Sequence, residues 1–122
     1  MKYSKLLSVG TAAYGAYALA RPRHLADVIG APSGQAPAFD RMALTYAGRD
    51  LSISGLAIAS ANPSVVTAAM ALRILGDLSD AAILGAGTTD RPDVQKKILA
   101  VTLGWAALNA IALVADRRAL KS

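Results

Sequence analysis

Five charged side chains lie in the middle of two apolar segments of the sequence. Arg49 and Asp50 interrupt the first segment, and Arg73, Asp77 and Asp80 recur at helical spacing in the second. An ionised side chain in membrane hydrocarbon costs about 2.5 to 3.5 kcal/mol on insertion scales, so such residues persist where they are paired or have a function. Paired charges fix the register of two helices, whereas an unpaired carboxylate in an apolar site can act as an acid or a base.

A hairpin is predicted from the turn signal at Asn62-Pro63, which separates the two apolar segments by only two or three residues. The segments must then run antiparallel and side by side, so residues equally far from the turn lie at equal depth. This count predicts that Arg49 pairs with Asp77 and that Asp50 pairs with Arg73.

One carboxylate is left over, because the two segments hold two Arg and three Asp. The depth count assigns this surplus to Asp80, at the level of Tyr46. Asp80 and Asp77 are therefore the candidate catalytic residues. The candidate ligand-binding residues are the charged set together with nearby aromatic and amide side chains: Tyr46, Arg49, Asp50, Arg73, Asp77, Asp80, Trp105 and Asn109.

Four apolar segments are long enough to cross a bilayer, which takes about 20 residues. We expect one domain, 1–122, with an all-α fold: an integral membrane four-helix bundle in the cell membrane, multi-pass. The predicted spans are 4–20, 41–61, 64–87 and 95–115, joined by a Pro/Gly-rich loop at 21–40 and a polar loop before the last span.

Composition supports a membrane protein and excludes several classes. Hydrophobic residues make up 54% of the chain and charged residues 17%, against about 25% charged in an average soluble domain. The net charge of +5 comes from short basic clusters at segment ends, which is typical of membrane flanks and unlike a nucleic-acid-binding stripe. The absence of Cys excludes disulfides and thiolate metal sites, and the single His24 without any Glu makes a weak metal ligand. We expect no metal and no cofactor.

The middle segments carry further patterns. Gly48, Ser52, Gly55 and Ala59 share one helical face, which predicts a close approach to another helix. Within the loop, residues 24–29 are expected to form one or two amphipathic turns on the membrane surface.

The last apolar segment carries polar and aromatic side chains on one face and is followed by three charged residues. Thr102, Trp105 and Asn109 lie on one side of the helix, and Asn109 needs a partner at that depth, so this face should turn toward the other helices. Asp116-Arg117-Arg118 is expected to end the membrane span.

Two questions stay open from the sequence. Residues 1–20 also fit a signal peptide, with a basic start, an apolar run and Ala18-Leu19-Ala20 as a cleavage site. Basic residues are balanced between the two sides of a four-span arrangement, so the positive-inside rule gives no orientation.

The chain resembles a bacterial and fungal family of small four-helix membrane proteins of unknown function, which are loosely similar to the DoxX-like proteins. The resemblance covers nearly the whole chain and rests on Arg21-Pro22-Arg23 with Gly30-Ala31-Pro32, Gly48-Arg49-Asp50 with Gly55, and Gly76-Asp77-Leu78-Ser79-Asp80. It implies four transmembrane helices with a polar core at these residues, and it implies no activity.

Two classes of function follow. The first is a binding or accessory module for an apolar ligand, a lipid or a larger membrane complex. The second is a small intramembrane enzyme that isomerises or hydrolyses an apolar substrate, with Asp77 or Asp80 transferring the proton. A proton-coupled small exporter ranks below both, because such exporters resemble one another in carrying an essential acidic residue in the first span and this first span has none.

A pocket beside Asp80 would separate these readings. A volume of about 300 Å³ or more favours binding or catalysis, whereas a filled core with every charge paired favours a structural module. The expected partner is the lipid bilayer, and no binding of nucleic acid is expected. Whether the protein forms a homo-oligomer stays open at this point.

Overall fold

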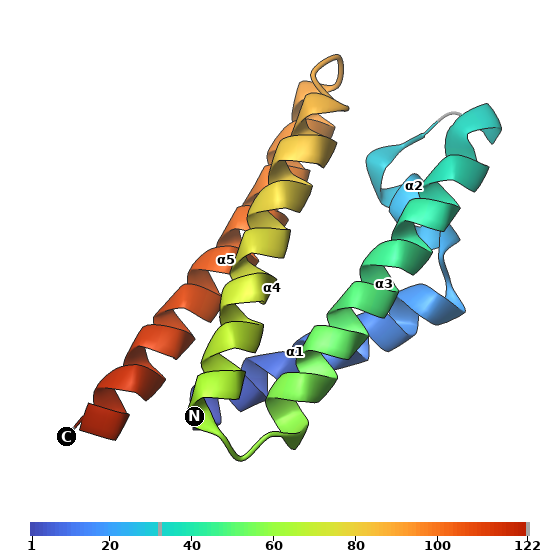
Figure 1. Ribbon diagram of the computed structural model, residues 1–122. Coiled ribbons are helices and arrows are strands. Elements are labelled where there is room, and N and C mark those ends of the chain that lie inside the picture. The colour runs from blue at the N-terminus through green and yellow to red at the C-terminus, as the bar shows by residue number, and fades with distance from the viewer. Residues whose placement is uncertain (32, 122) are drawn as a thin grey trace.

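The computed structural model describes residues 1–31 and 33–121, and this part of the chain is helical apart from its turns (Figure 1). Two short elements lie between the first two long helices: α2 (Arg23–Ile29) and the 3-10 helix η1 (Ser33–Gln35). The predicted all-α fold is confirmed. The long helices are α1 (Lys2–Ala20), α3 (Ala36–Ala59), α4 (Pro63–Ala86) and α5 (Pro92–Lys121).

The hairpin of α3 and α4 follows the turn signal of the sequence. Asn62 precedes α4, and its side-chain oxygen accepts a hydrogen bond from the backbone N–H of Ser64 at 2.9 Å. Pro63 occupies the first turn, where a missing N–H removes no helical hydrogen bond. In Figure 1 the two helices diverge from this turn, and α2 lies beside α3 toward the other end.

The segment expected to be a loop is partly helical. The amphipathic turns expected at residues 24–29 form α2, which ends at Gly30 in the left-handed conformation, with φ of 64°. Glycine adopts this conformation without a steric penalty. Helix α3 begins earlier than the predicted residue 41, because Pro37 fits the first helical turn. Pro32, which belongs to the expected loop, lies outside the described residues.

Helix α5 is longer than the predicted span at 95–115. It begins at Pro92 and continues through Asp116-Arg117-Arg118 to Lys121, so the helix itself extends beyond these charges. That they end the membrane span stays a prediction. Arginine has a high helix propensity, and a charged residue ends a membrane span without ending the helix itself.

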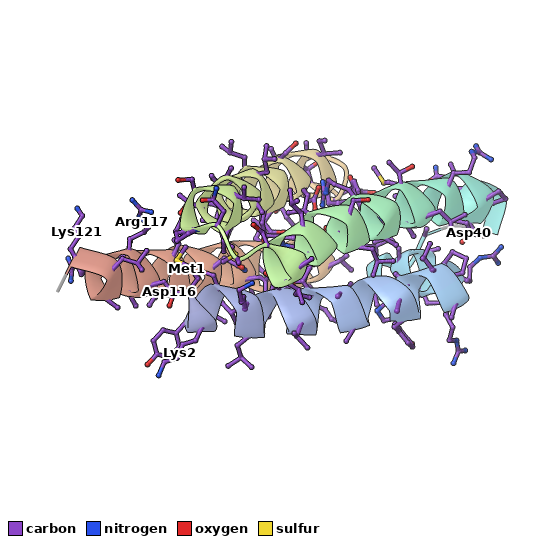
Figure 2. The ribbon with its side chains drawn as sticks, turned by 60° about the horizontal axis from the view of Figure 1, so that its bottom comes forward. Met1, Lys2, Asp40, Asp116, Arg117 and Lys121 are labelled. Atoms are coloured by element: carbon purple, nitrogen blue, oxygen red, sulfur yellow. The ribbon has the colours of Figure 1, made fainter. Side chains whose placement is uncertain are left out.

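Asp116 instead caps another helix. Its carboxylate accepts hydrogen bonds from the backbone N–H groups of Tyr3 at 3.2 Å and Ser4 at 2.7 Å. The first amides of a helix have no partner within that helix, so a carboxylate from α5 replaces a cap that the α1 sequence lacks. Figure 2 shows Asp116 beside Met1, with Lys121 further along α5.

The helices pack in neighbouring pairs. The most extensive contacts join α1 to α3 and α4 to α5, while α3 also packs on α4 and on α2, and α1 on α5. Lys5 of α1 binds the carboxyl end of α3, where its amino group donates to the carbonyls of Ala57, Ile58 and Ser60 at 2.9, 2.8 and 2.6 Å. Cations are stabilised at this end of a helix because its last carbonyls are unpaired.

Small and polar residues fill the interior, while large apolar residues face outward. Of the fifteen hydrophobic residues that are buried in the described part of the chain, ten are alanine. In the same part of the chain nineteen large hydrophobic or aromatic side chains are exposed, among them Leu6, Leu75 and Ile111 at 68%, 63% and 65%. This arrangement reverses that of water-soluble domains, where large aliphatic side chains are the ones buried.

The small-residue face of α3 is also on the outside. Gly48, Ser52, Gly55 and Ala59 are all exposed, and a methyl group added at Gly48 or Gly55 would meet no atom within 4 Å. The predicted close approach to another helix of the chain is therefore wrong. The opposite face of α3, with Ala43, Ala47 and Ala57, is the buried one.

Among residues 1–31 and 33–121, one helix is both long and apolar enough to cross a membrane, judged by length and composition alone. That helix is α5. In α3 and α4 the charged residues of the hairpin interrupt the apolar segments.

Candidate functional site

The five charged residues of the hairpin come together between α3 and α4. Asp50, Arg73, Asp77 and Asp80 are buried, with 4% to 8% of their surface exposed. Arg49 is partly buried, since 30% of its side chain is exposed. A charge at such depth is stable only when an opposite charge or hydrogen bonds compensate it.

The predicted pair of Asp50 and Arg73 is confirmed. Arg73 Nη1 lies 2.5 Å from Asp50 Oδ1, and both side chains are 9% exposed. Arg49 Nη2 lies 3.3 Å from the same oxygen. Asp50 therefore compensates both arginines of the cluster.

The predicted pair of Arg49 and Asp77 is wrong. Arg49 instead donates two hydrogen bonds to Asp80, from Nη1 to Oδ1 at 3.0 Å and from Nη2 to Oδ2 at 2.7 Å. This parallel geometry is the strongest that arginine and a carboxylate form. Asp80, expected to be the surplus carboxylate, is thus the best-paired of the three.

The error in pairing comes from counting backbone depth alone. Arg49 lies at the level of Asp77, but its long side chain extends along α4 and reaches the carboxylate one turn further from the hairpin turn. Gly76 makes this path available, because a methyl group at Gly76 would lie 3.3 Å from Arg49 Cζ. The side chain of Arg49 therefore reaches Asp80 by passing over α4 at Gly76, where no side chain blocks it.

Asp77 is the carboxylate with the weakest compensation. Its Oδ1 lies 3.3 Å from Arg73 Nη2, one turn away on the same helix. Its Oδ2 is buried and has no hydrogen-bond partner among the described residues, and the same holds for Arg73 Nε. A buried polar atom without a partner costs about 1 to 3 kcal/mol, so these two atoms mark the least compensated part of the charged cluster.

A cavity of about 420 Å³ adjoins the charged cluster. This volume lies in the range of small-molecule sites, about 300 to 1,000 Å³. The walls come from α1, α2, α3, α4 and α5: Gly10, Thr11, Tyr14, Leu25, Tyr46, Asp50, Arg73, Asp77, Asp80, Leu84, Val101, Thr102 and Trp105.

Six of the eight predicted ligand-binding residues line this cavity: Tyr46, Asp50, Arg73, Asp77, Asp80 and Trp105. Arg49 and Asn109 are not in its wall. Arg49 lies over the ring of Tyr46, with Cζ 4.9 Å from the ring centroid, so it contacts a residue of the cavity wall without being part of the wall.

The face of α5 predicted to turn inward does so. Trp105 Nε1 donates to Thr11 Oγ1 at 3.1 Å, which fixes the indole against α1. Asn109 is 1% exposed and donates from Nδ2 to the carbonyl of Trp105 at 2.8 Å, while its Oδ1 has no partner among the described residues.

Sequence reasoning missed the contribution of α1 to the cavity wall. Gly10, Thr11 and Tyr14 line it, although none was selected as a site residue. A signal was present for Tyr14, because a tyrosine inside an apolar helix turns its hydroxyl either to the interface or into the bundle. Nothing in the sequence distinguishes these two orientations.

Helix α2 contributes to the cavity wall and is held by contacts with other helices and with the segment before α5. Leu25 is part of the wall, and the buried Ile29 packs against Leu84 of α4 and Ile98 of α5. Arg91, from the loop before α5, donates from Nη1 to the carbonyl of Ile29 and to that of Gly30 at 2.9 Å.

The start of α2 is held by an exposed ion pair. Arg23 donates from Nε and Nη2 to Asp40 of α3, at 2.9 to 3.1 Å. These hydrogen bonds lower the pKa of Asp40 below its ordinary value. Asp40 lies at the opposite end of the molecule from Asp116 (Figure 2).

His24 belongs to an aromatic group beside the cavity. Its ring meets that of Tyr17 edge to face at 5.2 Å and that of Tyr14 at 6.1 Å between centroids. A smaller cavity of about 50 Å³ is lined by His24 and shares Tyr14 and Tyr46 with the main one. His24 therefore packs as an aromatic ring beside the site.

Comparison of the chain with known proteins finds no matching family model, no similar curated protein and no similar solved structure.

Proposed function

We propose that the protein is a small multi-pass membrane bundle that binds an apolar small molecule in the cavity between its helices. The observation that carries this proposal is the cavity of about 420 Å³, which is walled largely by apolar and aromatic side chains and includes three aspartates and one arginine in its wall. Ligand sites combine such walls with a few convergent polar groups.

The distribution of side chains supports placing this bundle in lipid. Helices that associate in a bilayer approach one another through small residues, because burying large aliphatic groups gains nothing when the solvent is itself apolar. The alanine-rich interior and the exposed Leu and Ile side chains follow this rule. The buried Arg and Asp residues turn inward, as ionisable groups within membrane helices do.

The bundle would then cross the membrane with α1, α3, α4 and α5. By length and composition α5 alone is apolar enough. In α3 and α4 the charged residues that lower the apolar content face one another inside the hairpin, so the lipid-facing surface of these helices is still apolar. The resemblance to the DoxX-like proteins is in keeping with four spans and adds no activity.

The test is native mass spectrometry of the protein purified in lipid nanodiscs. Wild-type protein should carry a bound apolar molecule, and Gly10→Leu should lose it, because Gly10 lines the cavity and a side chain added there extends toward Trp105. Gly55→Leu is the matched control, since it adds the same side chain to a helical glycine with no atom within 4 Å. Equal small-molecule content in all three proteins would contradict the proposal.

A second candidate is a small intramembrane enzyme that isomerises or hydrolyses an apolar substrate. One observation favours it: Asp77 lines the cavity and is the least compensated carboxylate of the cluster, and a carboxylate can donate or accept a proton. Asp80 is less suited to this role, because Arg49 occupies both of its oxygens. Chemical change of the co-purified molecule on incubation with wild-type protein, and its absence with Asp77→Asn, would establish the enzyme.

A further inference from the structure

The charged groups around the cavity do not balance. Among the residues that line it, three are aspartates and one is an arginine, Arg73. Adding Arg49, which binds Asp80 from outside the wall, gives two positive and three negative charges. The wall of the cavity therefore has an excess of one negative charge.

The contacts locate this excess at Asp77. Arg49 satisfies both oxygens of Asp80, and Asp50 lies closest to Arg73, at 2.5 Å. Asp77 has only the 3.3 Å contact with Arg73 through Oδ1, and its Oδ2 has no partner. A group bound beside Asp77 would thus meet a carboxylate that the protein itself leaves only partly compensated.

Aromatic rings complete the wall next to these carboxylates. Tyr14, Tyr46 and Trp105 all line the cavity. The ring of Tyr46 already carries the guanidinium of Arg49 at 4.9 Å, whereas Trp105 is held in place by its hydrogen bond to Thr11. Aromatic faces attract cations, and this attraction is strongest where water is excluded.

We propose that the ligand of this cavity is an amphipathic amine, whose ammonium group lies against Asp77 and whose apolar body lies among the aromatic and aliphatic side chains. This inference rests on the proposed function and specifies its ligand class. An ammonium ion supplies the missing positive charge and up to three hydrogen-bond donors beside Asp77, which is part of the cavity wall. Tyr14 and Trp105 line the same cavity, and aromatic rings attract cations.

Other polar groups match the site less well. A carboxylate could accept from Arg73 Nε, which has no partner among the described residues, but it would add a further negative charge to a wall that already holds three aspartates. A hydroxyl group can donate to a carboxylate of the wall but leaves the excess charge uncompensated. The three head groups therefore give a ranked expectation, with ammonium first, hydroxyl second and carboxylate last.

Trp105 provides a direct readout, since it is the single tryptophan of the sequence and lines the cavity. We would titrate wild-type protein in zwitterionic nanodiscs with three probes that share a 4-(4-bromophenyl)butyl body and end in an amine, an alcohol or a carboxylic acid. Bromine quenches a neighbouring indole, so quenching reports occupancy. Gly10→Leu, with its cavity partly filled, measures quenching from probe dissolved in the lipid, and Gly55→Leu controls for the substitution.

We expect the amine to bind wild-type protein at least about tenfold more tightly than the alcohol, and Asp77→Asn to abolish this preference while alcohol binding changes little. The ranking in wild-type protein alone tests the inference should Asp77→Asn fail to fold. Equal or tighter binding of the alcohol or acid overturns the amine inference and leaves the proposed function intact. Quenching by all three probes no greater than in Gly10→Leu overturns the proposed function itself.

Discussion

Two carboxylates on one face of α4 have different surroundings, and this difference decides what their substitution does. Asp80 holds Arg49 through two hydrogen bonds, whereas Asp77 shares Arg73 with Asp50 and keeps one oxygen unpartnered. Removing one member of a buried pair leaves the other charge uncompensated, and this costs about 3 to 5 kcal/mol.

Asp80→Asn should therefore lower the free energy of unfolding by about 3 kcal/mol, because it strands Arg49. Asp77→Asn should lower it by less than about 1 kcal/mol, since Arg73 keeps Asp50. The measurement is unfolding by sodium dodecyl sulfate in mixed micelles, followed by circular dichroism. Asp40→Asn, in the exposed pair with Arg23, is the control and should change little.

A double substitution checks that the loss comes from the stranded charge. Arg49→Leu combined with Asp80→Leu should recover much of the stability, because both buried charges are then absent. Destabilisation of equal size by Asp77→Asn and Asp80→Asn would show instead that Asp77 is a structural partner and would favour an accessory module.

Asp116 gives a second prediction at the scale of single residues. Asp116→Ala removes the acceptor for the backbone amides of Tyr3 and Ser4, which should lower the free energy of unfolding by about 1 to 2 kcal/mol. Arg117→Ala, at the next residue, should change it by less than about 0.5 kcal/mol. Hydrogen exchange at residues 3–6 should accelerate only in the Asp116 variant, and unchanged exchange there would mean that α1 needs no cap from α5.

Helix α2 contributes Leu25 to the cavity wall and is held in place by contacts with other elements. It is short, so its stability depends on contacts with other elements, namely Arg91 at its carboxyl end, Arg23 with Asp40 at its start and the buried Ile29. Of these contacts, the one from Arg91 joins α2 to the segment that precedes α5.

Arg91→Ala should loosen α2 without unfolding the bundle. A hydrogen bond from a charged donor contributes about 1.5 to 3 kcal/mol, so amide exchange in residues 24–30 should accelerate by about tenfold or more. Arg118→Ala is the control. It also removes an arginine, but one near the carboxyl end of α5, and it should leave this exchange unchanged. Equal exchange of α2 in wild type and Arg91→Ala would show that apolar packing alone holds the helix.

On the scale of the whole molecule, the proposed topology fixes which turns share a side of the membrane. The turn at residues 60–62 and the carboxyl end of α5 lie at one end of the bundle, and the loop between α4 and α5 lies at the other (Figure 1). The sequence contains no cysteine, so single cysteines can be introduced without a background.

Ala61→Cys and Lys121→Cys should react with a membrane-impermeant maleimide from the same side of proteoliposomes, and Asp90→Cys from the opposite side. Leu75→Cys should resist labelling, because this residue lies on the exposed apolar surface of α4 and a thiol in hydrocarbon stays protonated. Reaction of Leu75→Cys with the reagent, or labelling of Ala61→Cys and Asp90→Cys from one side, would contradict four spans.

The sequence by itself determined the helices and the composition of the polar core. Periodicity, run length and the signal at Asn62-Pro63 place the four long helices and the hairpin, because these are local properties of the chain. The depth count also predicts the pair of Asp50 and Arg73, since the rise per residue fixes the level of each side chain.

Only the tertiary structure decided which polar and charged side chains have hydrogen-bond or ion-pair partners. The rotation of each helix about its axis turned the small face of α3 outward, and the free surface at Gly76 directed Arg49 to Asp80. Asp116 became a cap for α1 because α5 passes the start of that helix, a contact between the two ends of the chain. Helix rotation, side-chain reach and contacts between distant parts of the chain cannot be read from sequence periodicity. For this reason the sequence did not predict that Asp77 is the least compensated carboxylate or that Tyr14 is part of the cavity wall.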